Sequence, residues 1–99
     1  MAVSEEFVVI NTVGLHARPA AALVKIAASY QSAIRVENLT RKTHAVNAKS
    51  LMSVLSIGVR NQDRVRITSD GEDEKVAMAA LAEVFESNFG ENKKVSGNP

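Results

Sequence analysis

One stretch marks the change from a strand-like to a helix-like pattern, and it reads Thr12-Val13-Gly14-Leu15-His16-Ala17-Arg18-Pro19-Ala20. Gly14 permits a backbone turn that residues with a side chain resist. Pro19 is tolerated only in the first turn of a helix, which places the helix start near His16 or Ala17. A helix start collects unpaired N–H groups at the positive end of the peptide dipoles, and it therefore favours an anion.

The segments on either side of this stretch have different periods. Residues 7–10 are aromatic or β-branched, which predicts a strand over residues 5–11. After the junction, the spacing of apolar residues is that of an amphipathic helix over residues 17–29. The predicted buried stripe of this helix consists of Ala20, Leu23, Val24, Ala27 and Ala28.

The remainder of the chain continues the alternation of strands and helices. Strands are predicted over residues 33–37, 43–47 and 64–69, with a polar hairpin turn over 38–43. A short helix is predicted over 48–57 and ends near Gly58. Acidic residues at 72–74 predict the start of a last helix. Its predicted buried stripe consists of Val76, Ala77, Ala80, Leu81, Val84 and Phe85.

This pattern predicts an α+β fold with the element order β-α-β-β-α-β-α. We expect an open-faced two-layer sandwich, in which three helices cover one face of a four-stranded antiparallel sheet. Residues 1–89 should form a single domain, and residues 90–99 should form a polar C-terminal tail.

Composition excludes several classes of function. The 12 basic and 11 acidic residues give a net charge of +1, which argues against nucleic-acid binding. The chain has no cysteine, so disulfides and thiolate metal sites are excluded. Because no signal peptide and no long apolar run is present, we expect a cytoplasmic protein that does not insert into a membrane. The sequence predicts no metal and no cofactor.

His16 is the candidate for chemistry, because a titratable ring at an anion-favouring helix start suggests that the anion is attached to the ring. Neutral imidazole is a nucleophile, and a loop-to-helix junction exposes it. Arg18 is slightly unfavourable in the first turn, since a cation opposes the helix dipole. That conflict points to an anionic partner. The second histidine, His44, lies in the polar hairpin region and is interpreted as a surface residue.

At residues 14–20, Gly-Leu-His-Ala-Arg-Pro-Ala, the chain resembles the HPr family of histidine-containing phosphocarrier proteins from the bacterial phosphoenolpyruvate-dependent phosphotransferase system. A second block, residues 47–58, looks like the family's regulatory-serine segment. The resemblance implies that His16 accepts a phosphoryl group from enzyme I and passes it to the IIA domain of a sugar permease. Arg18 would stabilise the phosphate with its forked donors. We expect a monomer.

The same resemblance assigns a regulatory role to Ser50 and a docking surface to neighbouring residues. As an N-cap, Ser50 has a structural role, and in many Gram-positive relatives the matching serine is phosphorylated by a serine kinase and restored by a phosphorylase. Exposed apolar residues on a short helix suggest a docking patch. The predicted partner-binding residues are Ala17, Ala21, Lys25, Lys49, Leu51, Met52 and Leu55.

Three departures from the family pattern leave alternatives open. Val13 replaces a small polar residue, the hairpin through residues 38–42 is longer than usual, and the tail continues after Phe89. An apolar residue before Gly14 also occurs in the nitrogen-related branch of the phosphotransferase system. A non-catalytic α/β interaction module would bind without covalent phosphate. An acid–base enzyme using His16 has no second acid or base placed by the motif.

Overall fold

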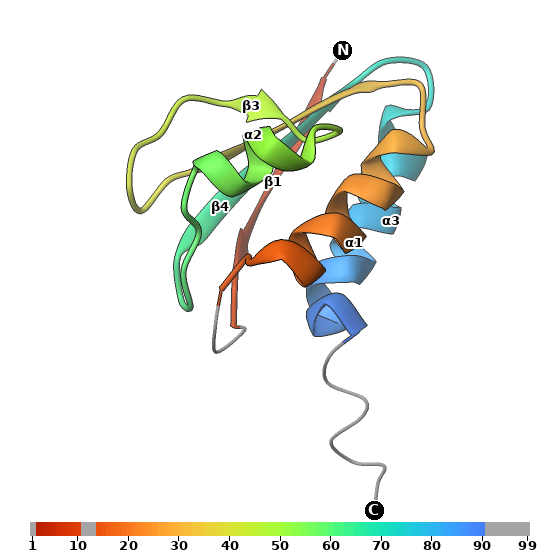
Figure 1. The fold of residues 1–99 in the computed structure, drawn as a ribbon. Coiled ribbons are helices and arrows are strands. Elements are labelled where there is room, and N and C mark those ends of the chain that lie inside the picture. Colours follow the sequence, from red (N-terminus) through yellow and green to blue (C-terminus); the bar gives the residue numbers. More distant parts are fainter. Residues whose placement is uncertain (1, 11–13, 91–99) are drawn as a thin grey trace, which may run out of the picture.

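The computed structural model describes residues 2–10 and 14–90 (Figure 1). Its elements are β1 (Val3–Val8), α1 (Ala17–Ala28), β2 (Ala33–Asn38), β3 (Val46–Asn47), α2 (Leu51–Ser56), β4 (Arg64–Asp70), α3 (Glu74–Glu86) and the 3-10 turn η1 (Asn88–Gly90). This is the predicted order β-α-β-β-α-β-α, and the predicted fold class is confirmed. Val13 and residues 91–99 of the predicted tail lie outside the described residues.

The four strands form one antiparallel sheet in the order β1-β4-β2-β3. Strand β4 lies between β1 and β2, with Ile67 opposite Val36 on one side and Val65 opposite Phe7 on the other. Strand β3 contributes only two residues, at the edge beside β2. The first strand, β1, therefore pairs with the last strand, β4, which lies inside the sheet.

One face of the sheet is buried under the helices, and the other is open. Ile34 and Val36 of β2 and Ile67 of β4 are buried, whereas Arg35 between them is exposed. This is the alternation expected of a sheet with one solvated face. Helix α3 packs on β1 and β4, and α1 packs beside α2 and α3 (Figure 1).

The core is largely aliphatic, as the composition predicts. Leu23 of α1, Val54 of α2 and Leu81 of α3 are fully buried and meet above the sheet. Phe85 stacks on Phe7 with 4.4 Å between ring centroids, which fixes α3 against β1. Burial of each such side chain contributes about 1.5–3 kcal/mol. The middle of α1 is therefore anchored in the core independently of the contacts at its two ends.

Several predicted boundaries and stripes were wrong in detail. Strand β1 begins at Val3 and ends at Val8, because β4 offers partners from Ser69 to Arg64. The strand predicted over 43–47 and the helix predicted over 48–57 are both shorter.

In α3, Val76 is 61% exposed and Met78 is buried instead. The buried face follows Ala77, Leu81 and Phe85, and Val76 is turned about 100° away from Ala77 around the helix axis. Ala28, at the end of α1, is exposed for want of a neighbour over its face.

Candidate functional site

His16 is the N-cap of helix α1, as predicted. Its backbone is extended, with φ −89° and ψ −169°, and its carbonyl accepts the Ala20 amide at 3.0 Å. The residue is exposed, and its side chain makes no capping hydrogen bond to the first turn. The imidazole therefore lies at the mouth of the helix without closing it.

The first turn of α1 presents donors and no acid. Ala17 and Arg18 have backbone N–H groups for which the described part of the chain supplies no acceptor, and Pro19 has no N–H. No acidic residue stands in this turn, and the Arg18 side chain is exposed. Two backbone amides and the positive end of the helix dipole thus make this helix start favourable for an anion.

The loop that carries His16 is held against the segment between α2 and β4. Gly14 has φ +72°, and a Cβ atom there would overlap the Val59 carbonyl oxygen and lie 2.8 Å from the Arg60 Cα. The buried Leu15 donates its amide to the Val59 carbonyl at 3.0 Å. Only glycine permits this approach, so Gly14 decides where the chain turns into the helix.

Sequence reasoning missed the partner side of this contact. Val59 supplies a backbone carbonyl, and backbone contacts between distant segments leave no pattern in side-chain periodicity. The sequence assigned no role to Asp63, in the turn that follows, yet this residue is buried. A hydrophobic residue followed by a charged turn is too common to indicate such a role.

Helix α2 runs beside α1 in the opposite direction. At its end, only residues 57–59 separate α2 from the Val59 carbonyl that binds Leu15. Before its start, Lys49 donates through Nζ to the Tyr30 carbonyl, beyond the C-terminal end of α1, at 2.7 Å. The end of α2 therefore lies toward His16, and Lys49 lies at the far end of the two helices.

The predicted partner-binding residues fall on these two helices. Ala17, Ala21 and Lys25 are exposed at intervals of four residues, so they share one face of α1. On α2, Leu51 and Met52 are 37% and 76% exposed, and Leu55 is half-buried. Lys49 is half-buried and already bonded to Tyr30. The predicted residues thus lie on two helices that contact each other, and Lys49 Nζ lies at Tyr30, beyond the C-terminal end of α1.

Ser50 is the N-cap of α2 and has the structural role predicted for it. Its Oγ accepts the Ser53 amide at 3.2 Å, and the residue is half-buried. His44 is exposed, as predicted. Neither residue adds a group to the first turn of α1.

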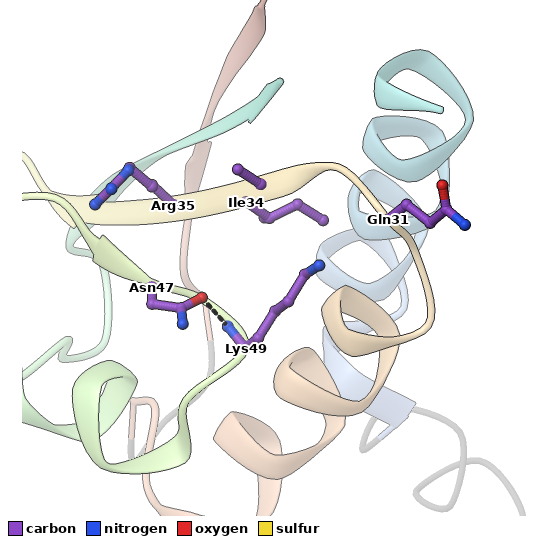
Figure 2. A pocket seen from close by; sticks show the side chains of 6 residues that line it. Gln31, Ile34, Arg35, Asn47 and Lys49 are labelled. Atoms are coloured by element: carbon purple, nitrogen blue, oxygen red, sulfur yellow. Dashed lines mark hydrogen bonds between the residues drawn. The ribbon is translucent and has the colours of Figure 1, made fainter. Parts of the chain in front are cut away.

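A surface groove of about 380 Å³ lies near Lys49 (Figure 2), lined by Gln31, Ala33, Ile34, Arg35, Asn47 and Lys49. Asn47 Oδ1 accepts the Lys49 backbone amide there at 2.9 Å. The groove sits at the C-terminal end of α1, so it is separate from the His16 site.

Within residues 2–10 and 14–90, no group of three or more His, Asp and Glu side chains is placed to hold a metal ion. Over the same residues, no helix combines the length and apolarity that a membrane crossing requires.

An open-faced α/β sandwich with an exposed histidine at an uncapped helix start defines a class of histidine-bearing carrier domains. A family described as "PTS HPr component phosphorylation site" matches residues 3–87. The chain belongs to this family, the HPr phosphocarrier proteins of the phosphotransferase system.

The relatives differ in how much of their own length the chain covers. The chain is 42% identical to a phosphocarrier protein HPr of Xylella fastidiosa over 87 residues, which cover 88% of this chain and 94% of that protein. It is also 42% identical to a multiphosphoryl transfer protein of Haemophilus influenzae, covering 92% of this chain but 18% of the relative's length. The crystal structure of HPr-C-His from Thermoanaerobacter tengcongensis superposes with a TM-score of 0.84 at 40% identity, covering 91% and 98% of the two chains.

Proposed function

We propose that this protein accepts a phosphoryl group on His16 from phosphorylated enzyme I and passes it to the IIA domain of a sugar permease. The observation that carries the proposal is the open first turn of α1, where the Ala17 and Arg18 amides lie beside the exposed His16. Fixed donors and charge are the main needs of phosphoryl transfer.

The transfer exchanges one P–N bond for another. An unprotonated ring nitrogen of His16 attacks the phosphorus of the donor phosphohistidine, and the donor P–N bond breaks with its electron pair returning to the donor ring. The N–H groups of Ala17 and Arg18 and the Arg18 guanidinium stabilise the charge on the phosphoryl oxygens. The reverse sequence delivers the group to the next histidine, so the carrier is a relay and does not turn over alone.

The docking surface in this proposal is the paired face of α1 and α2. Ala17 and Ala21 have small side chains that let a partner approach the His16 ring closely. Leu51 and Met52 add exposed apolar area, and Lys25 adds positive charge suited to acidic partners. We place enzyme I and the IIA domain on this one face in turn.

The experiment uses the whole chain, phosphoenolpyruvate and enzyme I. We expect a mass increase of one phosphate that is acid-labile and absent from His16→Ala, while His44→Ala, a control at the other exposed histidine, keeps it. Failure to acquire phosphate from a competent enzyme I contradicts the proposal. Acceptance only from the enzyme I of the nitrogen-related branch would assign the chain to that branch.

We further propose that phosphorylation of Ser50 weakens docking. Ser50 lies directly before the exposed Leu51 and Met52, so a phosphate there adds negative charge at the docking face. The start of α2 would tolerate it, because the dipole is favourable. With a serine kinase and ATP, an acid-stable phosphate should appear on the chain and be absent from Ser50→Ala, with Ser53→Ala as the control. A stable phosphate that survives Ser50→Ala refutes this assignment.

A further inference from the structure

Asp63 forms a buried polar cluster beneath the loop that carries His16. Its Oδ2 accepts hydrogen bonds from the Asn38 side-chain amide at 3.1 Å, the Arg41 Nε at 3.2 Å and the Arg60 backbone amide at 3.0 Å. Burial acts to raise the pKa of the Asp63 carboxyl, but these hydrogen bonds and the charge of Arg41 outweigh it and hold the pKa below its ordinary value. The group is therefore an ionised carboxylate that three donors share.

The donors come from segments far apart in the chain. Asn38 ends β2, Arg41 lies in the β2–β3 hairpin, and Arg60 lies in the turn before β4. Asn38 also donates to the Ile57 carbonyl at 3.1 Å, so the cluster binds both ends of segment 57–63. The hairpin that departs in length from the family pattern supplies the one guanidinium in the cluster.

Segment 57–63 in turn forms hydrogen bonds with residues on both sides of the junction before α1. The Val59 carbonyl accepts the Leu15 amide, and the Asp63 carbonyl accepts the Val9 amide at 2.9 Å. Gly14 packs directly on Val59 and Arg60. A movement of segment 57–63 would therefore move Leu15, which is covalently joined to His16.

We propose that Asp63 is a positioning residue for phosphoryl transfer, which it controls through segment 57–63 and the Leu15–Val59 hydrogen bond. This inference rests on the proposed function of His16. Asp63 touches no reacting atom. Its carboxylate fixes the angle at which the chain enters α1, and thereby the placement of the His16 ring relative to the first-turn amides. Small misplacements of reacting groups can lower a rate by about 100-fold.

Asp73 provides a matched control at the opposite end of α1. Its carboxylate also joins distant segments, accepting the Gln31 amide at 2.8 Å, the Ser32 amide at 2.9 Å and the Ser32 hydroxyl. The hydrogen bonds from Ser32 and Gln31 lower the pKa of Asp73. Both carboxylates accept three hydrogen bonds, but Asp63 lies near the N-terminal end of α1 and Asp73 near the C-terminal end.

The test compares Asp63→Asn with Asp73→Asn in the full chain. Three quantities are measured: unfolding free energy, hydrogen exchange of the Leu15 amide, and the second-order rate of phosphate acceptance from phosphorylated enzyme I. For Asp63→Asn we expect faster Leu15 exchange and a rate lowered about tenfold, within the range that misplacement produces. For Asp73→Asn we expect a loss of stability with the rate within about twofold and Leu15 exchange unchanged at matched stability.

Asp63→Ala, which removes the acceptor altogether, should exceed Asp63→Asn in both effects. Equal rates for the two asparagine variants, or a rate that follows global stability alone, would overturn the inference. If the unchanged chain accepts no phosphate, the proposed function fails. Leu15 exchange then still tests whether Asp63 holds Leu15 in place through segment 57–63. If the unchanged chain does accept phosphate and Asp63→Asn leaves both exchange and rate unaltered, only the positioning role is refuted.

Discussion

The two ends of helix α1 are built in opposite ways. At the C-terminal end, Lys49 caps the Tyr30 carbonyl, and Asp73 accepts the next two amides, those of Gln31 and Ser32. At the N-terminal end, His16 leaves the first turn uncapped. Polar groups at the closed end have partners within the fold, whereas the described residues supply no acceptor for the Ala17 and Arg18 amides at the open end.

The difference matters for the proposed function, because that function needs an accessible helix start. An uncapped helix start forgoes about 0.5–2 kcal/mol relative to a good N-cap. Gly14 and Leu15, just before α1, are held against segment 57–63 instead. Because this support comes from segment 57–63, the N-terminal end of α1 stays accessible.

The largest loss of stability is expected from a substitution that affects both ends of α1 alike. Leu23 is fully buried in the middle of α1, and Leu23→Ala should cost about 2–5 kcal/mol of unfolding free energy. Denaturant unfolding measures the loss, and amide exchange should accelerate at Leu15 and at Ser32 together. Exposed Ala21→Gly on the same helix is the control and should cost only about 1 kcal/mol. Protection lost at one end alone would contradict a shared core.

Gly14→Ala should break only the open end. A side chain there suffers the left-handed conformation, which costs about 1–2 kcal/mol, and also overlaps the Val59 carbonyl. We expect a larger loss of stability than for Gly58→Ala, together with slower phosphate acceptance. Gly58 is the matched control, since it has φ +56° but open space around its Cβ position. Equal losses for the two variants would show that the close approach to Val59 is unimportant.

Lowering the pH should weaken the hydrogen-bonded clusters around Asp63 and Asp73. Asp63 and Asp73 have pKa values below the ordinary 3.8, so the unfolded chain takes up protons before the folded one does. Their contribution is complete above the unfolded pKa and is lost as pH falls through the lower folded pKa. Thermal unfolding from about pH 5 to pH 2 should show a steeper loss for the unchanged chain than for Asp63→Asn/Asp73→Asn. An equal slope in the double variant would refute the linkage.

The smallest effect on stability, with the opposite sign, is expected at Arg18. Removing a cation from a helix start should stabilise the fold by about 0.3–1 kcal/mol at low salt. Arg18→Gln should nevertheless accept phosphate more slowly, because the forked donor is lost. The exposed Arg35→Gln, remote from the junction, is the control for net charge and should change neither quantity. A rate unaltered by Arg18→Gln would remove Arg18 from the site.

Much of the open end was predictable. The Gly14, His16 and Pro19 positions define a turn, a cap and a first helical turn within six residues, where local rules apply. The element order and the exposed face of α1 follow from periodicity in the same way. The partner of this end was not predictable, because Val59 acts through its backbone and Asp63 acts through burial in a turn.

Two side chains near the closed end depend on how the helices pack. Lys49, which the resemblance places on the docking surface, donates its ammonium group to the Tyr30 carbonyl. Val76 was assigned to the core because it is apolar, yet the direction of α3 turns it to solvent. Both outcomes depend on how helices lie beside one another, which no local pattern specifies.

By itself, the sequence determined the order of strands and helices and the start of α1, and it singled out His16 as the candidate for the chemistry. These depend on backbone preferences and on side-chain period, which act over a few residues. Only the tertiary structure decided that segment 57–63 supports the His16 loop and that Asp63 and Asp73 hold the two ends of α1. The Leu15–Val59 and Gln31–Asp73 hydrogen bonds join residues more than 40 positions apart, and their strength comes from burial and hydrogen bonding that exist only once the sheet has formed.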